Sequence, residues 1–574
     1  MAVQVRRRYH AACHIAEGDY EMQRQSLPIL KCAVIGGFAL WLMFNEQNLG
    51  AHEGHQAATY EVARSVANVE KGKHLRLKII DAESGRPAAA RFVLTIDGKG
   101  YVPRYLGKHG LRFSSIHKRR KQRFIATYAR GTGDVLIPLP DGAGSGTVTV
   151  TKGFEFVSKT ASFDADHSNT NVEVQLSRWV NMQADGWHAA DEHLHYERTD
   201  PKHDSDWLNM LDADGLSHAH FLVLKGGNLS GIWAQQFAYG KAGEANDGKR
   251  LIRPGEEYRD STQGHINLLG IEKVIPPIST GGIGEPRVPF NYPPLLDVFR
   301  RSHELGGIGG PAHGGSLARS STAALDTVLG QVDFFEIANT HLYKTDAWYR
   351  LLNCGFIVPP VAGTDLPNFG FRDPWQPLLG EVRTYVRCGG RHDFDAWKQA
   401  VRRGEVFVTS GPVIQLDVDG AGPGGVVRLS PKGGQITITA ELASPRPLEA
   451  LEVVSMGQPL SVEIRRTHEN GVHRLKLKQE LAISESCWLA ARGTGGPKVA
   501  VEQGLGIRQN VMAHTGVVQV LIGDQPIRSK AEVEKLKQQL VQQQEHYRTQ
   551  ARYENPEHRL RFVKLFEQAI KRLD

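Results

Sequence analysis

The hydrophobic pattern of the chain changes several times along its length. Between residues 73 and 178, short runs alternate apolar and polar side chains, as at 74–80, 90–95, 135–139 and 146–151, and Gly, Asp and Pro separate them. A period of two is typical of strands that bury one face. We therefore predict a small β-sandwich over residues 73–178.

From residue 179 to 412 the texture differs, because apolar strand-like runs alternate with helical patterns such as 294–305 and 346–353. This alternation predicts an α/β domain over residues 179–412. Beyond it, alternation returns at 414–419, 435–440 and 451–454, and Asn470-Gly471 predicts a hairpin between 462–466 and 472–477. We predict a C-terminal β-domain over residues 413–525.

The last segment, residues 529–574, reads as a helical tail. Ser529 and Glu532 form a capping-box pattern ahead of a helix over 535–552, and Asn555-Pro556 predicts the start of a second helix that reaches residue 574. Its charges and its glutamines at 538–544 indicate a solvated face or a contact between copies of the chain. A homo-oligomer through these helices is therefore one expectation.

The N-terminal segment, residues 1–51, predicts targeting rather than a folded element. Residues 32–44 are an uninterrupted apolar run preceded by Arg24 and Lys31, which is the length of a signal-peptide core and short for a membrane span. Translation from Met22 would give a compact signal. We expect export to the periplasm or the cell exterior, with an uncleaved N-terminal anchor as the alternative.

Composition narrows the class of protein further. The 574 residues exceed one hydrophobic core, and 40% hydrophobic with 23% charged residues is ordinary globular material. The net charge of +7 comes from scattered basic residues, so we predict no nucleic-acid partner, and no membrane contact beyond the possible anchor. The five cysteines lack paired spacing and predict no disulfide framework.

The first candidate for chemistry is Asp191-Glu192-His193-Leu194-His195. Alternate side chains of a strand point the same way, so His193 and His195 would project together, a spacing that suits one metal ion. Alone the pattern is weak. The chain has 24 histidines, and His218 and His220 repeat the spacing inside the apolar run 216–224, where a core or substrate-pocket role is expected.

Four more candidate ligands follow strand-like runs: Glu257, His265, His313 and Asp365. Each has an ordinary explanation by itself, since a histidine caps loops and an Asp after Gly-Thr suits an Asx-turn. Together, four imidazoles and two carboxylates from separate strand ends are hard to explain as packing, and strand ends of an α/β barrel open onto one face. They predict a metal site, which Asp191, Asp204 and Asp206 would support by orienting its histidines, unless they are plain surface turns.

Five motifs in order resemble the PHP (polymerase and histidinol phosphatase) superfamily, in the branch of the CehA/McbA metallohydrolases, named for a carbaryl hydrolase. They are DEHLH (191–195), PGEE with GHINLLG (254–257 and 264–270), GGIGGPAHGG (306–315), AGTD (362–365) and the exit GEVRTYV (380–386). The resemblance implies a distorted (β/α) barrel over 179–412. It also implies that His193, His195 and Asp365 hold one metal, that His265 and His313 hold a second, and that Glu257 rather than Glu256 bridges them.

The segment 148–157 resembles the carboxypeptidase regulatory-like domain, a module found beside exported hydrolases, and this likeness implies no activity.

Fuller sites of the superfamily hold a third metal, and the chain departs from their pattern there. Tyr196 follows the first histidine pair, the second motif ends in Asn228 where the family has a histidine, and Pro367 stands two residues after Asp365. All three losses fall on one metal. We therefore predict a dinuclear site of zinc, manganese or iron, unless His203, His218 or His220 replaces a lost ligand.

Two functions remain in view. The resemblance implies an exported hydrolase in which a hydroxide between two metals attacks a phosphoester, carbamate or carboxylic ester, with Glu257, Asp365 and His313 as catalytic residues. Gln235 and Arg383 are candidates for substrate contact. The alternative is a metal-holding binding module of the cell envelope, such as a glycan binder. No GxSxG elbow or Walker loop indicates serine or nucleotide chemistry.

Overall fold

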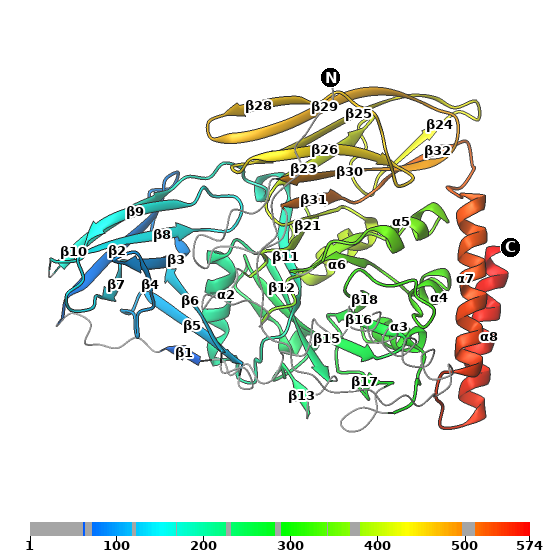
Figure 1. Cartoon of the computed structure of the whole chain (residues 1–574), viewed down its shortest axis with the longest axis horizontal. Coiled ribbons are helices and arrows are strands. Elements are labelled where there is room, and N and C mark those ends of the chain that lie inside the picture. Colours follow the sequence, from blue (N-terminus) through cyan, green and yellow to red (C-terminus); the bar gives the residue numbers. More distant parts are fainter. Residues whose placement is uncertain are drawn as a thin grey trace, which may run out of the picture. The chain divides into compact units, whose positions relative to one another are not determined.

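The computed structural model describes residues 61–63, 72–117, 122–167, 169–225, 231–281, 289–340, 342–367, 379–495 and 511–574 (Figure 1). All of them belong to one unit, Ala51–Asp574. The predicted signal segment at 1–51 lies outside the described residues. Within the described part of the chain, no helix combines the length and the apolar character needed to cross a membrane.

The first part of the unit is built from two β-sheets. One has the order β1-β5-β6-β3-β8-β9, with β4 beside β3, and the other has the order β10-β2-β7. Leu75 and Leu77 of β2 and Phe92 and Leu94 of β3 are buried in one cluster, so alternate positions of both sheets face a shared core. The strands are β1 (Glu61–Ala63), β2 (His74–Asp81), β3 (Ala89–Ile96), β4 (Lys99–Tyr101), β5 (Gly110–His117), β6 (Gln122–Arg130), β7 (Val135–Pro138), β8 (Ser145–Thr151), β9 (Lys159–Asp164) and β10 (Asn169–Leu176).

The described residues of the central region form twelve further strands, most of them short and buried. They are β11 (Trp187–Leu194), β12 (His218–Lys225), β13 (Ile232–Trp233), β14 (Ala245–Asn246), β15 (Leu251–Asp260), β16 (Gly264–Leu269), β17 (Ser279–Thr280), β18 (Ile308–Pro311), β19 (Phe335–Ala338), β20 (Pro360–Ala362), β21 (Arg383–Arg387) and β22 (Val406–Thr409). β19 and β20 form a small parallel sheet of their own. The others join a large sheet.

The predicted (β/α) barrel is wrong, because the described strands of the central region do not close on themselves. They belong to a 16-stranded sheet whose main path, β18-β16-β15-β12-β11-β21-β22-β31-β30-β26-β27, is open at both ends. Only β11, β12 and β15 run parallel along this path in the central region. β15 and β16 form an antiparallel hairpin across residues 261–263, and β18, β21 and β22 are antiparallel to their neighbours. A barrel of this type needs parallel strands separated by helices.

Among the described residues, these strands are accompanied by the α-helices α2 (Asp204–Ala213), α3 (Leu295–Glu304), α4 (Ala323–Val328), α5 (Asp346–Asn353) and α6 (Phe394–Arg403). Helix α6 illustrates why they form. Asp393 caps its start by accepting a hydrogen bond from Ala396 N, and Gly404 ends it with a φ of 77°. Phe394 and Trp397, three residues apart, bury one face of this helix.

The C-terminal strands continue the large sheet, since β22 pairs with β31 and β31 with β30. A separate four-stranded sheet has the order β23-β25-β29-β28. Its hairpin turns at Asn470 and Gly471, which have φ values of 53° and 74°, as a type I′ turn requires. The strands are β23 (Val413–Val418), β24 (Val426–Leu429), β25 (Gly434–Ser444), β26 (Leu448–Ser455), β27 (Gln458–Pro459), β28 (Arg465–Glu469), β29 (Val472–Ile483), β30 (Cys487–Gly495), β31 (Met512–Thr515) and β32 (Val518–Ile522).

Two helices, α7 (Lys530–Thr549) and α8 (Pro556–Leu573), pack side by side at the end of the chain (Figure 1). Ser529 caps α7 by accepting from Glu532 N, and Asn555 caps α8 by accepting from His558 N. Gln543 of α7 is fully buried and donates to Ala318 O. This glutamine therefore contacts the chain's own central region rather than solvent.

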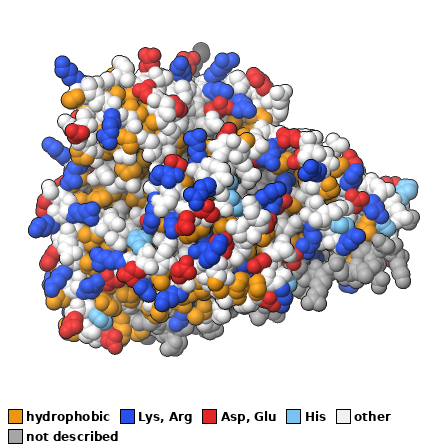
Figure 2. Space-filling model, turned by 180° about the vertical axis from the view of Figure 1, so that it is seen from behind, with side chains coloured by type: hydrophobic (Ala, Val, Ile, Leu, Met, Phe, Trp, Pro, Cys, Tyr) orange, Lys and Arg blue, Asp and Glu red, His pale blue; other side chains and the backbone are white. Residues whose placement is uncertain are grey.

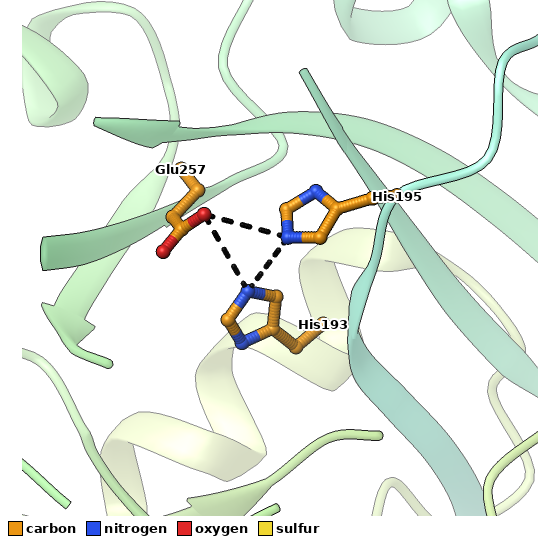
Figure 3. A group of neighbouring side chains, drawn as sticks. All are labelled: His193, His195 and Glu257. Atoms are coloured by element: carbon orange, nitrogen blue, oxygen red, sulfur yellow. Dashed lines mark hydrogen bonds and ion pairs between the residues drawn. The ribbon is translucent and has the colours of Figure 1, made fainter. Parts of the chain in front are cut away.

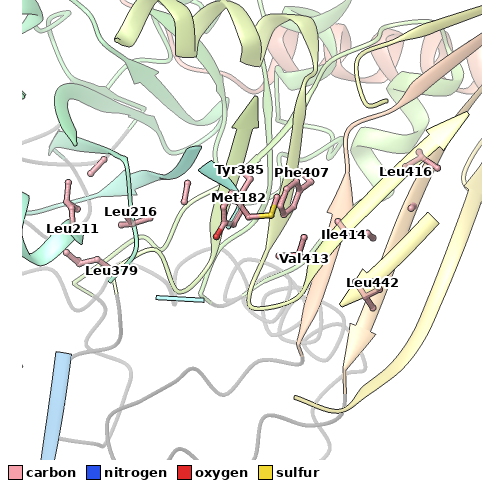
Figure 4. Packing of buried hydrophobic residues seen from close by; sticks show 14 of the residues in the cluster. Met182, Leu211, Leu216, Leu379, Tyr385, Phe407, Val413, Ile414, Leu416 and Leu442 are labelled. Atoms are coloured by element: carbon pink, nitrogen blue, oxygen red, sulfur yellow. The ribbon is translucent and has the colours of Figure 1, made fainter. Parts of the chain in front are cut away.

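One hydrophobic cluster continues from the central region into the C-terminal strands (Figure 4). The rings of Tyr385 and Phe407 stack with centroids 4.7 Å apart, and Ile414, Leu416 and Leu442 belong to the same cluster. On the face in Figure 2, acidic and basic side chains are interspersed rather than separated by sign.

Candidate metal centre

Neighbouring strands bring the first three predicted ligands together. His193 lies near the end of β11, His195 directly follows that strand, and Glu257 lies in β15, two strands away across β12. Since β11, β12 and β15 are parallel, the three side chains reach the same end of the sheet. Figure 3 shows the two imidazoles and the carboxylate pointing toward one another.

The distances define the first half of the site. The Nε2 atoms of His193 and His195 lie 3.0 Å apart. Glu257 Oε2 lies 3.4 Å from His195 Nε2 and 4.0 Å from His193 Nε2. Asp365 Oδ1 approaches the same two nitrogens, at 3.2 Å from His195 and 3.5 Å from His193. Two imidazoles and two carboxylates thus converge on one point.

Asp365 is held against β11 by its own backbone. Its N–H donates to His193 O at 2.7 Å, and His195 N donates to Leu366 O at 2.6 Å. The φ of Asp365 is 57°, in the left-handed region that few residues other than glycine adopt. Such backbone strain is characteristic of functional sites. Here it turns the carboxylate toward the two histidines.

The second half of the site uses the other oxygen of Glu257. Oε1 lies 3.1 Å from His265 Nδ1 and 3.2 Å from His313 Nε2. His265 lies in β16 opposite Arg259, and His313 follows β18 with a φ of 57°. The side chains of His265 and His313 are 18% and 15% exposed, whereas those of His193, His195, Glu257 and Asp365 are at most 1% exposed. Solvent therefore reaches the site from the side of His265 and His313.

The tautomers of His193 and His195 allow both Nε2 atoms to bind a metal ion. His195 Nδ1 donates to Leu222 O at 2.8 Å, and His193 Nδ1 lies 2.9 Å from Glu336 Oε1, which accepts its proton. In neutral rings both Nε2 atoms then carry lone pairs, and lone pairs 3.0 Å apart repel unless a proton or a cation lies between them. The donor set of imidazole nitrogens and carboxylate oxygens suits zinc, manganese or iron.

Electrostatics differ between the two halves. Burial lowers the pKa of His193, but Glu336 and Asp365 outweigh it and raise that pKa well above its usual range. The pKa of His195 is also raised, since Asp365 and Glu257 outweigh its burial. Burial and then Arg259 lower the pKa of His265 to about 3. A histidine that stays neutral is a ready metal ligand.

Three groups of ligand atoms in the described part of the chain lie within 4.8 Å of one another. They are His193 with His195 and Glu257, His193 with His313 and Asp365, and Glu257 with His265 and His313. All six predicted ligands are included. The structure thus has His, Glu and Asp groups that could hold a metal ion.

Glu256, the carboxylate set aside in favour of Glu257, points to the other face of β15. There it accepts a hydrogen bond from Ile275 N at 2.8 Å, and burial raises its pKa to about 8. This is the alternation expected of neighbouring strand residues.

Sequence reasoning missed Glu336. This residue of β19 is fully buried, and its Oε2 accepts from His313 N at 2.5 Å while Oε1 faces His193. It therefore supports one ligand from each half of the site. Asn267 and Asn339 approach His193 Nδ1 and His313 Nδ1 at 3.1 Å and 3.0 Å. The sequence contains one signal for Glu336, which is a carboxylate inside the otherwise apolar run 334–338. Burying a charged side chain costs free energy, so a buried carboxylate indicates a specific role.

The aspartates predicted to orient the histidines have different roles. Asp191 is fully buried and accepts from the backbone N–H groups of His193, Thr364 and Gly380, which ties β11 to the loop that carries Asp365. Asp204 pairs with Arg198, and Asp206 pairs with Arg130.

For each of the residues that could replace a lost third ligand, the structure shows contacts with groups other than the six predicted ligands. His203 lies 3.7 Å from Asp206, and His220 Nε2 lies 3.4 Å from Glu192 with its ring against Trp397. His218 packs against the ring of His392. Of the three departures from the family pattern, Tyr196 and Pro367 are described, and Asn228 lies outside the described residues.

The two candidate substrate residues make their contacts with other parts of the described chain. Arg383 is fully buried, donates to the carbonyls of Gly380, Gly215, Asp214 and Leu379, and lies over the ring of Phe154. Its guanidinium therefore holds backbone segments together. Gln235 is exposed, and its carbonyl accepts from Arg198 N.

Comparison of the chain with protein-family models, with curated proteins and with solved structures gave no match.

Proposed function

We propose that this chain is a metal-dependent hydrolase of ester-type bonds, of the PHP type that its motifs resemble. The observation that carries the proposal is Glu257, whose two carboxylate oxygens each face a different set of imidazoles. A carboxylate so placed suits a bridge between two ions. Two divalent ions bound there would lower the pKa of water and polarise the oxygen of the scissile group.

The chain's own residues have distinct parts in this proposal. His193, His195 and Asp365 would hold one ion, and His265 and His313 the other, with Glu257 shared between them. Glu336 fixes the ring of His193, and Leu222 O fixes that of His195. Substrate would approach from His265 and His313, the two ligands that solvent reaches.

Metal analysis and a substrate screen test the proposal together. Purified protein should carry about two equivalents of zinc, manganese or iron and should hydrolyse at least one of p-nitrophenyl phosphate, bis(p-nitrophenyl) phosphate, p-nitrophenyl acetate and a nitrophenyl carbamate. Two bound metals without turnover on any of them would favour the rival, a metal-holding binding module. Three equivalents would overturn the dinuclear assignment.

Variants separate the bridging ligand from the others. Glu257→Ala should lose both equivalents, because its Oε1 lies within 3.2 Å of His265 and His313 while its Oε2 faces His193 and His195. Asp365→Ala should lose one, because Asp365 comes no closer than 3.9 Å to His313. His468→Ala is the control, since it removes an exposed imidazole on β28. Equal metal loss in Glu257→Ala and Asp365→Ala would argue against the bridge.

A further inference from the structure

Arg259 is a buried cation at the edge of the metal centre. It lies two residues beyond Glu257 on β15, so both side chains project from the same face of the strand. Its Nε donates to His265 Nε2 at 3.3 Å and lies 3.9 Å from Glu257 Oε1. Only 4% of the residue is exposed.

The guanidinium of Arg259 makes fewer hydrogen bonds than those of Arg198 and Arg383, which are also buried. Arg198 donates to both oxygens of Asp204 and to Gly243 O, and Arg383 donates to four backbone carbonyls. In contrast, Nη1 of Arg259 is buried and has no hydrogen-bond partner among the described residues. Burying a charged donor without an acceptor is costly, and such groups are retained where they have a role.

The position of Arg259 indicates what that role is. The side chain contacts His265, one of the two ligands on the side where solvent reaches the site. Glu257 offers it opposite charge at 3.9 Å but no hydrogen bond from that distance. The positive charge of Arg259 therefore lies beside His265, next to the two ligands through which solvent reaches the site.

We propose that Arg259 binds an anionic oxygen of the substrate, so that the site selects phosphoesters over neutral carbamates and carboxylic esters. This inference rests on the proposed hydrolase function and specifies its substrate class. A guanidinium fork matches the geometry of phosphoryl oxygens, and charge-assisted hydrogen bonds are about twice as strong as neutral ones. A neutral ester presents no charge to offset the buried cation.

A matched pair of substrates tests this selectivity. p-Nitrophenyl phosphate and p-nitrophenyl acetate share a leaving group and differ in the charge beside the scissile bond. The measured quantity is the kcat/KM for the phosphate divided by the kcat/KM for the acetate. Arg259→Gln should lower this ratio at least about tenfold, since a hydrogen bond to a charged group is lost. Arg259→Lys keeps the charge without the fork and should give an intermediate ratio. Arg403→Gln removes a surface charge that pairs with Glu405 and should leave the ratio unchanged.

Binding of inorganic phosphate, measured by calorimetry on the metal-loaded protein, gives a readout that does not depend on turnover. Arg259→Gln should weaken phosphate binding at least about tenfold at unchanged metal content. Equal loss of both activities together with unchanged phosphate affinity would overturn the inference. If Arg259→Gln does not fold, Arg259→Lys supplies the same comparisons. If no ester is hydrolysed but phosphate binding depends on Arg259, the hydrolase proposal fails and the anion site stands.

Discussion

At the scale of single residues, the period of a strand predicts part of the candidate site. His193 and His195 are predicted because alternate positions share a face, whereas Glu257 is predicted from the motif that resembles the PHP family. The structure places the three residues with 3.0–4.0 Å between their nitrogen and oxygen atoms. Glu336 escaped the same reasoning because its neighbours at 334–338 are apolar. Its role appears only when β19 is placed beside His193 and the loop of His313, and these contacts join residues far apart in the chain.

Replacing Glu336 tests whether it supports the ligands. Glu336→Gln should lower metal affinity about 10- to 100-fold, because the amide accepts more weakly from His193 Nδ1 and leaves the imidazole less basic. Competition with a chelator measures the change. Glu304→Gln on α3 removes an exposed carboxylate that pairs with Arg301 and should have no effect. Equal affinities for wild type and Glu336→Gln would show that the contact is only structural.

Asp326 in α4 predicts a pH dependence of stability. Burial raises its pKa from 3.8 to about 8, against the opposing hydrogen bond from Thr322 Oγ1. The folded state holds the proton of Asp326 more tightly than the unfolded state does. The contribution of this carboxyl to stability is therefore fully present below pH 3.8 and is lost as pH rises toward 8. The free energy of unfolding should fall by up to about 1.4 kcal/mol per pH unit in this window.

Asp326→Asn keeps an acceptor for Thr322 but cannot ionise, so denaturant unfolding between pH 5 and 8 should show a flatter profile than wild type. Asp395→Asn, which removes an exposed carboxylate of α6, should reproduce the wild-type slope. Identical slopes for Asp326→Asn and wild type would refute this assignment.

At the scale of elements, local pattern predicted many strands and helices but not how they pair. The alternation at 74–80 and 146–151 appears as β2 and β8, and the caps at Ser529 and Asn555 begin α7 and α8. The barrel was wrong because pairing depends on partners distant in sequence. The runs that contain Glu257 and His265 are predicted as strand-like parts of an α/β domain, but their sequence does not show that they pair with each other as one antiparallel hairpin.

The β15–β16 hairpin depends on the absence of a side chain at Gly255. A Cβ there would meet the backbone oxygen of Leu268 on β16 and the side chain of Leu222 on β12. Gly255→Ala should therefore lower the free energy of unfolding by about 1–3 kcal/mol and reduce metal content, because β15 carries Glu257. Gly390→Ala, with open space around the new methyl group, is the control in urea unfolding. An unchanged midpoint for Gly255→Ala would contradict the packing.

At the scale of the whole molecule, the segments predicted as separate domains share structure. The large sheet passes the expected boundary at 412–413 through the pairing of β22 with β31. The terminal helices share a hydrophobic cluster with central residues such as Trp348 and Leu325. Composition and turn signals near residues 413 and 529 mark changes of pattern along the chain. They do not reveal that residues on both sides of these boundaries share one hydrophobic core.

Two positions on α7 test whether the tail stabilises the molecule. Tyr547 is fully buried, stacks on Phe562 with ring centroids 4.6 Å apart, and donates to Ser320 O. Tyr547→Ala should lower the free energy of unfolding by about 3–5 kcal/mol, as removal of a large buried ring does. Val541 on the same helix is 47% exposed, and Val541→Ala should change stability by less than about 0.5 kcal/mol. Similar effects of the two variants in thermal unfolding would contradict a supporting role.

The pairing of β22 with β31 also bears on the order of events during synthesis. All six predicted ligands have been synthesised once Asp365 is in the chain. However, β22 can pair with β31 only after Met512–Thr515 has left the ribosome. Until then the growing chain presents an unpaired strand edge, which favours association with other chains. We therefore expect the site to become stably held, and able to capture metal, only after β31 has been synthesised.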